Sequence, residues 1–268
     1  MGNDIFRSSG LTSITITRNV SQIGIAPFSA CTQLTEINVD EANPYFSSLD
    51  GVLTDKNRTT IVAYPAGKGK RYIIPDGITK IGTHSFFACY PITYIHMPNS
   101  VKTIELFAFA SCTDLDTVIL GNSVDSIEGA AFRINDRLKT IYSMNPIPPA
   151  AHPEAFSSFS PMFFIQCTLH VPVGSLQAYK NAEVWKNFKN IVENDFTGIE
   201  RPSPDKAKIF GNKNSIAFRN IEPGTDISIY DTTGKCIKTF AVDGDSEIPL
   251  PSGIYLIKYA GRTVKIIL

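Results

Sequence analysis

Hydrophobic and polar positions recur with a fixed spacing over the first two thirds of the chain. Each full copy opens with an apolar residue and two variable residues, followed by an apolar–variable–apolar triplet such as Ile14-Thr15-Ile16. A phenylalanine ends the unit, and Phe86, Phe109 and Phe132 follow one another at intervals of 23 residues. A fixed period in the twenties is typical of a solenoid. Because so short a unit cannot bury its apolar face alone, we expect neighbouring copies to stack into one continuous core.

The repeat consensus resembles a known family. The apolar triplets give a Leu-x-x-Ile-x-Leu core, and the segments Met97–Val101, Ile81-Gly82 and Ala108–Cys112 resemble the BspA-like leucine-rich repeat family of bacterial surface proteins. The resemblance covers roughly residues 5–192. It implies a mainly β fold, a curved leucine-rich repeat solenoid, and extracellular-matrix proteins such as fibronectin as partners.

One stretch, residues 43–70, departs from the period. Its two β-prone runs, Gly51–Thr54 and Thr60–Tyr64, flank the polar segment Asp55–Thr59 and predict a β-hairpin. The insertion also looks like the hairpin-bearing repeat of the same family. Asp50, Asp55 and Asn57 suggest calcium, but their spacing lacks the glycine and terminal glutamate of a calcium loop, so we favour a polar turn.

The solenoid domain is predicted to span residues 1–194 and to end in a cap over residues 168–192. Leu169–Pro172 is expected to be the last strand, and Ser175 can cap a short helix that follows it. Trp185, Phe188 and Ile191 come next as apolar residues that would seal the last repeat. The family resemblance implies the same closing element.

The pattern changes after a proline- and charge-rich stretch, residues 195–206, which we predict to be a linker. Residues 207–268 then contain short alternating runs separated by turns such as Asp231–Gly234, which predict a small antiparallel β-sandwich. Ile229–Asp231, Gly253–Leu256 and the terminal Val264–Ile267 resemble the C-terminal sorting domain of type IX secretion substrates. This resemblance implies passage across an outer membrane.

Charge and hydropathy exclude two classes of partner. The 25 basic residues balance 25 acidic ones, so no overall field favours nucleic acid or an anionic membrane. No apolar run approaches the roughly 20 residues that span a bilayer.

Phe6 lies 22 residues before Phe28, so the chain begins near the end of a repeat. We therefore expect further residues before Met1, and with them any export signal.

The cysteines follow the repeat. Cys31, Cys89 and Cys112 each stand three residues after a repeat phenylalanine, which predicts a ladder of small buried thiols. The alternative is a disulfide between neighbouring repeats. Neither Cys167 nor Cys236 has a histidine or cysteine at metal-ligand spacing, so we expect no metal site and no cofactor.

No sequence motif for catalysis is present. His84, His96, His152 and His170 lie in separate repeats, and the chain has no Gly-x-Ser-x-Gly elbow or phosphate loop. We therefore predict that the protein is not an enzyme.

A binding surface can be predicted from the strand geometry. Strand side chains alternate between faces, so residues flanking the middle apolar position should point away from the core and line the concave face. The resulting array is Ser13, Thr15, Glu36, Asn38, Arg71, Ile73, Tyr94, His96, Thr117, Ile119, Thr140 and Tyr142. The predicted ligand-binding residues are Tyr94, His96, Ile119 and Tyr142, with Arg71 and Ile73 beside them. The alternative is that tyrosine and isoleucine occur there only because they favour strands.

The favoured function is a non-enzymatic exported or cell-surface binding protein of the adhesion type, which recognises a protein or glycan through its concave face. The two resemblances together imply an extracellular or outer-membrane location on a bacterium. Two alternatives stay open. One is a scaffold or substrate-capturing subunit of a surface assembly, and the other is a fragment of a longer protein with a catalytic domain upstream.

Overall fold

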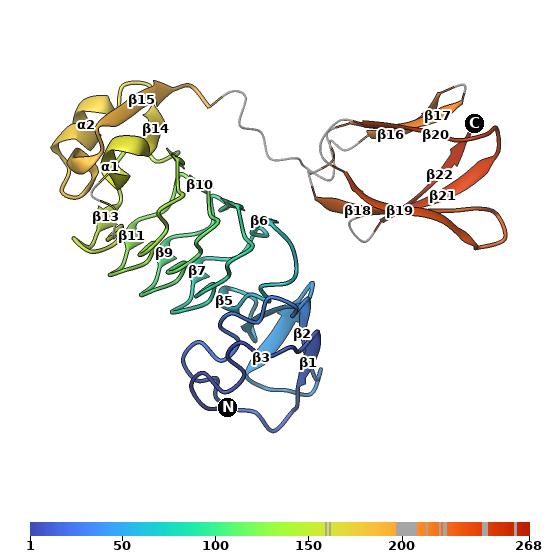
Figure 1. Ribbon diagram of the computed structural model, residues 1–268, viewed down its shortest axis with the longest axis horizontal. Coiled ribbons are helices and arrows are strands. Elements are labelled where there is room, and N and C mark those ends of the chain that lie inside the picture. The colour runs from blue at the N-terminus through green and yellow to red at the C-terminus, as the bar shows by residue number, and fades with distance from the viewer. Residues whose placement is uncertain are drawn as a thin grey trace. The chain divides into compact units, whose positions relative to one another are not determined.

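The computed structural model describes residues 1–158, 160, 162–196, 208–212, 214–219, 221, 224–242, 246–259 and 262–268. It divides into two compact units, Met1–Asp195 and Phe196–Leu268. Figure 1 shows stacked coils in the first unit and two antiparallel sheets in the second. The mainly β fold with a solenoid and a C-terminal antiparallel domain is thus confirmed.

Each regular turn of the solenoid, called a rung here, contributes one strand to each of two parallel arrays. The first array is a six-stranded sheet that contains β6 (Arg71–Ile73), β8 (Tyr94–His96), β10 (Thr117–Leu120), β12 (Thr140–Ser143), β14 (Thr168–Pro172) and β15 (Asn190–Asn194). The apolar triplets account for these strands, because alternate side chains turn inward. A separate pair, β1 (Ser13–Ile16) and β2 (Glu36–Val39), continues the same motif at the N-terminus.

The second array was not predicted. It is a seven-stranded sheet whose parallel part contains β7 (Lys80–Ile81), β9 (Thr103–Ile104), β11 (Ser126–Ile127) and β13 (Ala150–Ala151). Three of these two-residue strands end in an isoleucine. Ile81, Ile104 and Ile127 are aligned across neighbouring strands. Strands this short carry no alternation that could have been recognised in the sequence.

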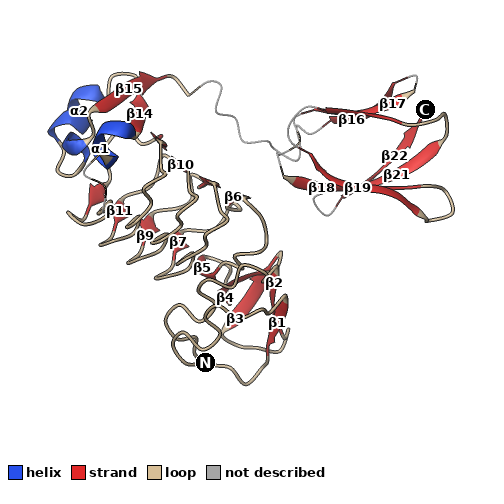
Figure 2. Cartoon of the chain, viewed as in Figure 1, coloured by secondary structure: helices blue, strands red, loops and turns tan. Residues whose placement is uncertain are grey.

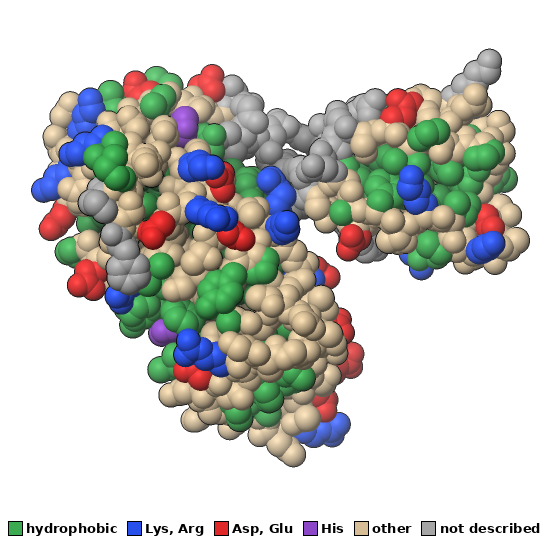
Figure 3. All heavy atoms as spheres, viewed as in Figure 1, with side chains coloured by type: hydrophobic (Ala, Val, Ile, Leu, Met, Phe, Trp, Pro, Cys, Tyr) green, Lys and Arg blue, Asp and Glu red, His purple; other side chains and the backbone are tan. Residues whose placement is uncertain are grey.

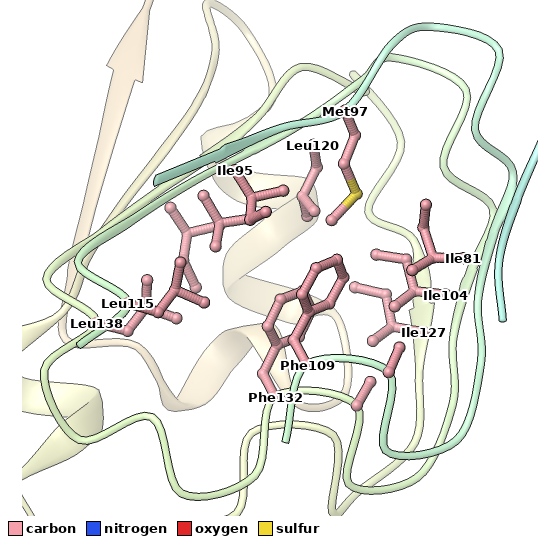
Figure 4. Packing of buried hydrophobic residues seen from close by; sticks show 14 of the residues in the cluster. Ile81, Ile95, Met97, Ile104, Phe109, Leu115, Leu120, Ile127, Phe132 and Leu138 are labelled. Atoms are coloured by element: carbon pink, nitrogen blue, oxygen red, sulfur yellow. The ribbon is translucent and has the colours of Figure 1, made fainter. Parts of the chain in front are cut away.

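The repeat phenylalanines form a buried stack through the middle of the solenoid. The ring centroids of Phe86 and Phe109 lie 4.6 Å apart, and those of Phe109 and Phe132 lie 5.2 Å apart with nearly parallel planes. Phe156 continues the stack 5.3 Å beyond Phe132. Figure 4 shows the rings between the inward side chains of the two arrays. The predicted burial of the repeat phenylalanines in this region is therefore confirmed.

The cysteine ladder has a defined hydrogen-bonding role. The Cys112 thiol donates to the Phe86 carbonyl at 3.1 Å, and Asn135 donates from the equivalent position of the next rung to the Phe109 carbonyl at 2.9 Å. Burial raises the pKa of the Cys112 thiol to about 12, so the donor proton is retained at neutral pH. All five cysteines are free. The small residue at this position therefore ties each rung to the one before it, and the ladder contains no disulfide.

The insertion is part of the solenoid rather than a projection from it. The predicted hairpin is present as β4 (Val52–Asp55) and β5 (Thr60–Ala63), and β3 (Phe46–Leu49) adds a strand that was not predicted. Asp55 accepts hydrogen bonds from the Thr59 and Thr60 amides, each at 2.7 Å, as expected for a polar turn.

The same strands divide the core. Val52 and Ile61 belong to the main cluster of buried residues, whereas Leu53 and Ala63 belong to a second cluster around Phe28. The expectation of one continuous core is therefore wrong, because adjacent residues of β4 face opposite clusters.

The repeat resumes earlier than predicted. Tyr64 takes the place of a phenylalanine in the buried stack, with its ring centroid 4.7 Å from that of Phe86. β5 is already paired with β7 in parallel, so the regular stacking begins before Tyr72.

The C-terminal end of the solenoid is closed by α1 (Phe163–Gln166), α2 (Leu176–Asn181), the 3-10 turn η1 (Trp185–Asn187) and β15, as Figure 2 shows. The Trp185 indole donates to the Pro149 carbonyl at 2.7 Å and so occupies the acceptor that a further strand would have used. The Tyr179 hydroxyl donates a hydrogen bond to the Asn145 carbonyl at 2.8 Å. It also lies within hydrogen-bonding distance of the Ser143 hydroxyl, at 2.7 Å.

Two details of this cap differ from prediction. β14 is not the last strand, because β15 pairs with it in parallel through Leu169 and Ile191. Ser175 stands at the start of α2 but makes no side-chain cap bond. Glu193 of β15 instead accepts from the Gly174 and Leu176 amides at 2.8 and 3.2 Å.

The second unit is built from two antiparallel sheets. One contains β16 (Lys208–Asn212), β17 (Ser215–Arg219) and β20 (Ser246–Pro249), and the other contains β18 (Thr225–Tyr230), β19 (Cys236–Val242), β21 (Ile254–Tyr259) and β22 (Arg262–Ile267). Inward residues of both sheets, such as Phe218 and Ile229, share one buried cluster. β16 and β20 were not predicted. The other five strands correspond to alternating runs in the sequence, which are Ser215–Phe218, Asp226–Tyr230, Cys236–Phe240, Gly253–Ile257 and Thr263–Ile267.

The turn at Asp231–Gly234 is confirmed, with Asp231 accepting from the Thr233 and Lys235 amides at 2.9 and 3.0 Å. Most of the predicted linker, residues 197–206, lies outside the described residues, as does the turn at residues 243–245. Within the described part of the chain, none of the helices has the length and hydropathy that a bilayer crossing requires.

Candidate functional site

The outward face of the six-stranded sheet carries two parallel rows of side chains, set by strand register. Row one is Arg71, Tyr94, Thr117, Thr140, Thr168 and Asn190. Row two is Ile73, His96, Ile119, Tyr142, His170 and Val192. All six predicted site residues lie in these rows. The residue between the two rows in each strand, such as Val118, points into the core.

Row one begins with a cationic side chain on an aromatic ring. The Arg71 guanidinium carbon lies 3.8 Å from the centroid of the Tyr94 ring, which is the geometry of a cation–π contact. Arg71 is exposed and Tyr94 is half-buried. The pair therefore offers a ligand a flat surface with a positive charge above one ring.

His96 and Ile119 differ from the prediction. Each residue is only 3% exposed, so neither offers much surface to a ligand, although both were predicted to point away from the core and line the concave face. Neither belongs to the hydrophobic core cluster. Their register offers a physical reason: Ile119 lies between His96 and Tyr142 on adjacent strands, which are about 4.8 Å apart in a sheet. At that spacing, large neighbours in one row cover a side chain between them.

Row two contains a second stacked pair, formed by Tyr142 and His170, and His170 was not predicted as a site residue. The rings of Tyr142 and His170 are 4.5 Å apart and inclined by 18°. Burial lowers the pKa of His170 below its ordinary value, so the imidazole is neutral at pH 7 and stacks as an uncharged ring. Val192 follows with 45% of its surface exposed. Extending the same register rule to the triplet Leu169–Val171 would have identified His170.

The N-terminal part of the predicted array lies on a different sheet. Ser13 pairs with Glu36 and Thr15 with Asn38, but β1 and β2 form a two-stranded sheet of their own. The six-stranded sheet begins at Arg71. The structure thus separates these four polar residues from the rows that carry the aromatic pairs.

The described residues contain no group of three or more histidine, cysteine, aspartate or glutamate side chains placed to hold a metal ion. On the face visible in Figure 3, acidic and basic side chains are interspersed over both units. The two rows present flat rings, one exposed guanidinium and threonine hydroxyls.

Comparisons with known proteins agree with the repeat architecture. The family model described as the BspA type leucine rich repeat region matches six copies over residues 1–49 and 65–170, more than half of the chain. The unmatched segment between them contains both β4 and β5. A search of curated proteins found no match.

Solved structures of low sequence identity are similar to part of this chain. The pneumococcal vaccine antigen PcpA is 19% identical, with a TM-score of 0.49 over 72% of this chain and 58% of that one. A leucine rich cell surface protein from Faecalibacterium prausnitzii is 20% identical, with a TM-score of 0.43 over 72% of this chain and 50% of that one. A leucine-rich repeat protein from Bacteroides ovatus is 17% identical, with a TM-score of 0.32 and coverage of 72% and 68%.

This chain therefore spans 58% and 50% of the length of the first two structures. The family assignment depends on the repeat model, whose matches coincide with the rungs that carry the phenylalanine stack and the cysteine–asparagine ladder. The chain belongs to the BspA-type leucine-rich repeat family.

Proposed function

We propose that the protein is a non-enzymatic binding protein of the bacterial cell surface that recognises a protein or glycan ligand through rows one and two. Membership of a family of surface proteins is consistent with binding or adhesion. The single observation that carries the proposal is that one regular sheet face holds two stacked pairs. These are the cation–π contact of Arg71 on Tyr94 and the ring stack of Tyr142 on His170.

Physical chemistry favours these pairs as contact points. Tyrosine brings a large apolar ring and a polar hydroxyl with few rotatable bonds, so little conformational entropy is lost on binding. Stacking on His170 and Arg71 holds both rings in place before a ligand arrives. Ligands with flat apolar faces and hydroxyl or carbonyl groups suit such a surface, which includes both sugar rings and peptide segments. Matrix proteins such as fibronectin are candidates on the family resemblance alone.

Truncating either tyrosine should weaken binding. Once a glycan or matrix-protein array has identified a ligand, Tyr142→Ala and Tyr94→Ala should each raise Kd about thirtyfold, the equivalent of roughly 2 kcal/mol for an interface anchor. Thr15→Ala, on the separate β1–β2 sheet, should leave Kd unchanged. Thermal unfolding must first show that each variant is folded. Wild-type affinity in both tyrosine variants would exclude the rows as the contact surface.

We further propose that residues 207–268 act as a sorting domain that carries the solenoid to an extracellular or outer-membrane location. The support is their strand content together with the motifs Ile229–Asp231 and Gly253–Leu256, which lie on β18 and β21 and their adjoining turns. The two-unit division allows such a module to fold as a separate body.

Removing the second unit tests the sorting role. In a bacterium with a type IX secretion system, the full protein fused to a signal peptide should reach the surface, as measured by protease accessibility on intact cells. Deletion of residues 207–268 should retain the solenoid in the periplasm. Surface display of the deleted protein at the level of the full protein would contradict the proposal, and binding by rows one and two would not be affected by that result.

A further inference from the structure

A hollow on the other side of the solenoid is separate from the two rows. It is an open depression with a volume of about 700 Å³ beside β9, β11 and β13, whose adjacent positions along the second array are visible in Figure 1. Pockets for small-molecule ligands usually have volumes of about 300–1,000 Å³. Leu106, Phe107, Gly129, Ala130, His152 and Glu154 are among its lining residues.

The hollow lies where two neighbouring rungs differ in side-chain size. The positions three and two residues before the ladder phenylalanine are Leu106 and Phe107 in one rung but Gly129 and Ala130 in the next. The small residues of the second rung leave open space beside the two large apolar side chains of the first. A Cβ atom added at Gly129 would lie 3.4 Å from Leu106 Cδ1 and 3.3 Å from His152 Nδ1, so the glycine opens the space between them.

The apolar wall is aromatic and partly open to solvent. Phe107 stacks on His84 of the preceding rung with 4.9 Å between ring centroids, which fixes the orientation of the phenyl ring. Leu106 keeps 40% of its surface exposed. Exposed leucine beside an ordered phenyl ring is a surface on which an aliphatic chain can lie.

The polar lining of the hollow is negatively charged. Glu128 and Glu154 both line it and are exposed, and neither takes part in any ion pair found among the described residues. Glu128 Oε2 accepts a hydrogen bond from the Leu106 amide at 3.0 Å, which holds the carboxylate next to the apolar wall. Glu154 also lines a smaller neighbouring hollow together with Arg133.

We propose that this hollow is a docking site for an arginine side chain carried by an extended, apolar peptide segment of a partner protein. Arginine combines an aliphatic stem, which suits Leu106 and Phe107, with a planar cation that carboxylates bind through charge-assisted hydrogen bonds. The guanidinium can also stack on an aromatic ring. Charge complementarity selects this occupant, since an acidic or phosphorylated peptide would meet two carboxylates.

The test uses a fluorescein-labelled acetyl-leucyl-arginyl-valinamide peptide and the full chain, with fluorescence anisotropy as the readout. A peptide with citrulline in place of arginine is the matched control, because citrulline keeps the shape of the side chain and removes its charge. We expect the arginine peptide to bind about tenfold more tightly than the citrulline peptide. Equal binding of the two peptides, or no binding of either, would overturn the proposal.

Variants of the chain locate the site. Gly129→Leu should fill the hollow and abolish binding, and Gly129 is not among the residues with positive φ, so the backbone tolerates a side chain. Glu128→Gln should weaken binding of the arginine peptide about fivefold and Glu154→Gln about threefold, typical of exposed ion pairs. The smaller effect is assigned to Glu154 because this residue also lines the neighbouring hollow together with Arg133, whose positive charge offsets part of its attraction for the peptide. Glu128 does not line that hollow.

Glu183→Gln, an exposed glutamate of the cap, is the matched control and should not change binding. Unchanged affinity in both Gly129→Leu and Glu128→Gln would show that the peptide binds elsewhere, and the glutamate variants keep the test valid if Gly129→Leu does not fold. Tyr142→Ala should bind the arginine peptide normally, so failure of this inference is distinguishable from failure of the proposed function.

Discussion

Phe109→Ala is expected to lower the free energy of unfolding by about 3–5 kcal/mol, the range for buried aromatic residues truncated to alanine. The ring is fully buried and stacks on Phe86 at 4.6 Å and on Phe132 at 5.2 Å. Its removal therefore leaves a cavity that two neighbouring rungs share. The loss comprises the transfer free energy of the ring and the dispersion contacts of both neighbours.

Urea denaturation followed by circular dichroism measures this loss. Phe87→Ala is the matched control, because Phe87 is half-buried, lies outside the stack and meets His84 only through an edge contact at 5.3 Å. Its truncation should destabilise the protein clearly less. Equal losses for the two variants would mean that the phenylalanine stack is not the centre of the core.

Trp185→Ala is expected to cost a similar 3–5 kcal/mol and to open the C-terminal cap. The indole is fully buried, lies 5.5 Å from both Phe156 and Tyr179, and donates to the Pro149 carbonyl. Alanine removes the ring that covers the last repeat phenylalanine and leaves the carbonyl without its donor.

Trp185→Phe separates these two contributions. It keeps an aromatic ring in the cap but removes the N–H group together with the other atoms of the five-membered ring, so it should cost less than Trp185→Ala, with about 1–3 kcal/mol of the loss due to the unsatisfied buried acceptor. Hydrogen exchange of β14 and β15 amides should increase in Trp185→Ala more than in Trp185→Phe. If Trp185→Phe is as stable as the wild type, the indole–carbonyl bond makes no net contribution.

The repeat period was sufficient to predict the solenoid, because every rung uses the same few apolar positions. Phe86, Phe109 and Phe132 recur at equal spacing, and equal spacing requires equal backbone paths. The backbone itself was less predictable. His84, Phe107 and Ala130 have φ values of 57°, 55° and 55° at equivalent positions, although phenylalanine and alanine are not residue types that local preference would place there. Stacking of neighbouring rungs imposes this conformation.

The candidate site was predicted in register but not in exposure. Alternation assigns Tyr94 and His96 to the same outward face, which strand pairing supports. Exposure depends on the sizes of neighbours in the row, and a local pattern does not give those contacts. The Arg71–Tyr94 contact and the Tyr142–His170 stack likewise join residues from adjacent rungs.

Contacts between distant segments explain the remaining differences. The capping preference of serine suggested Ser175 as the start of α2, yet Glu193 accepts the amide protons there because β15 returns alongside the helix. Tyr64 in the phenylalanine stack could not be recognised by spacing, since the insertion places it 36 residues after Phe28 rather than 23. Both results depend on how the chain returns to the solenoid.

The rung-to-rung bonds also bear on how such a gene can change length. The Lys102 and Asp125 amides donate to Thr79 and Lys102 carbonyls, both at 2.8 Å, and the Glu105 and Glu128 amides donate to Ile81 and Ile104 carbonyls, both at 2.9 Å. Each rung thus receives from one side the bonds that it offers on the other. An in-frame duplication or loss of one 23-residue unit, such as 92–114, joins ends that already match. Recombination can therefore lengthen or shorten the protein by whole rungs, because the new neighbours can form the same backbone hydrogen bonds.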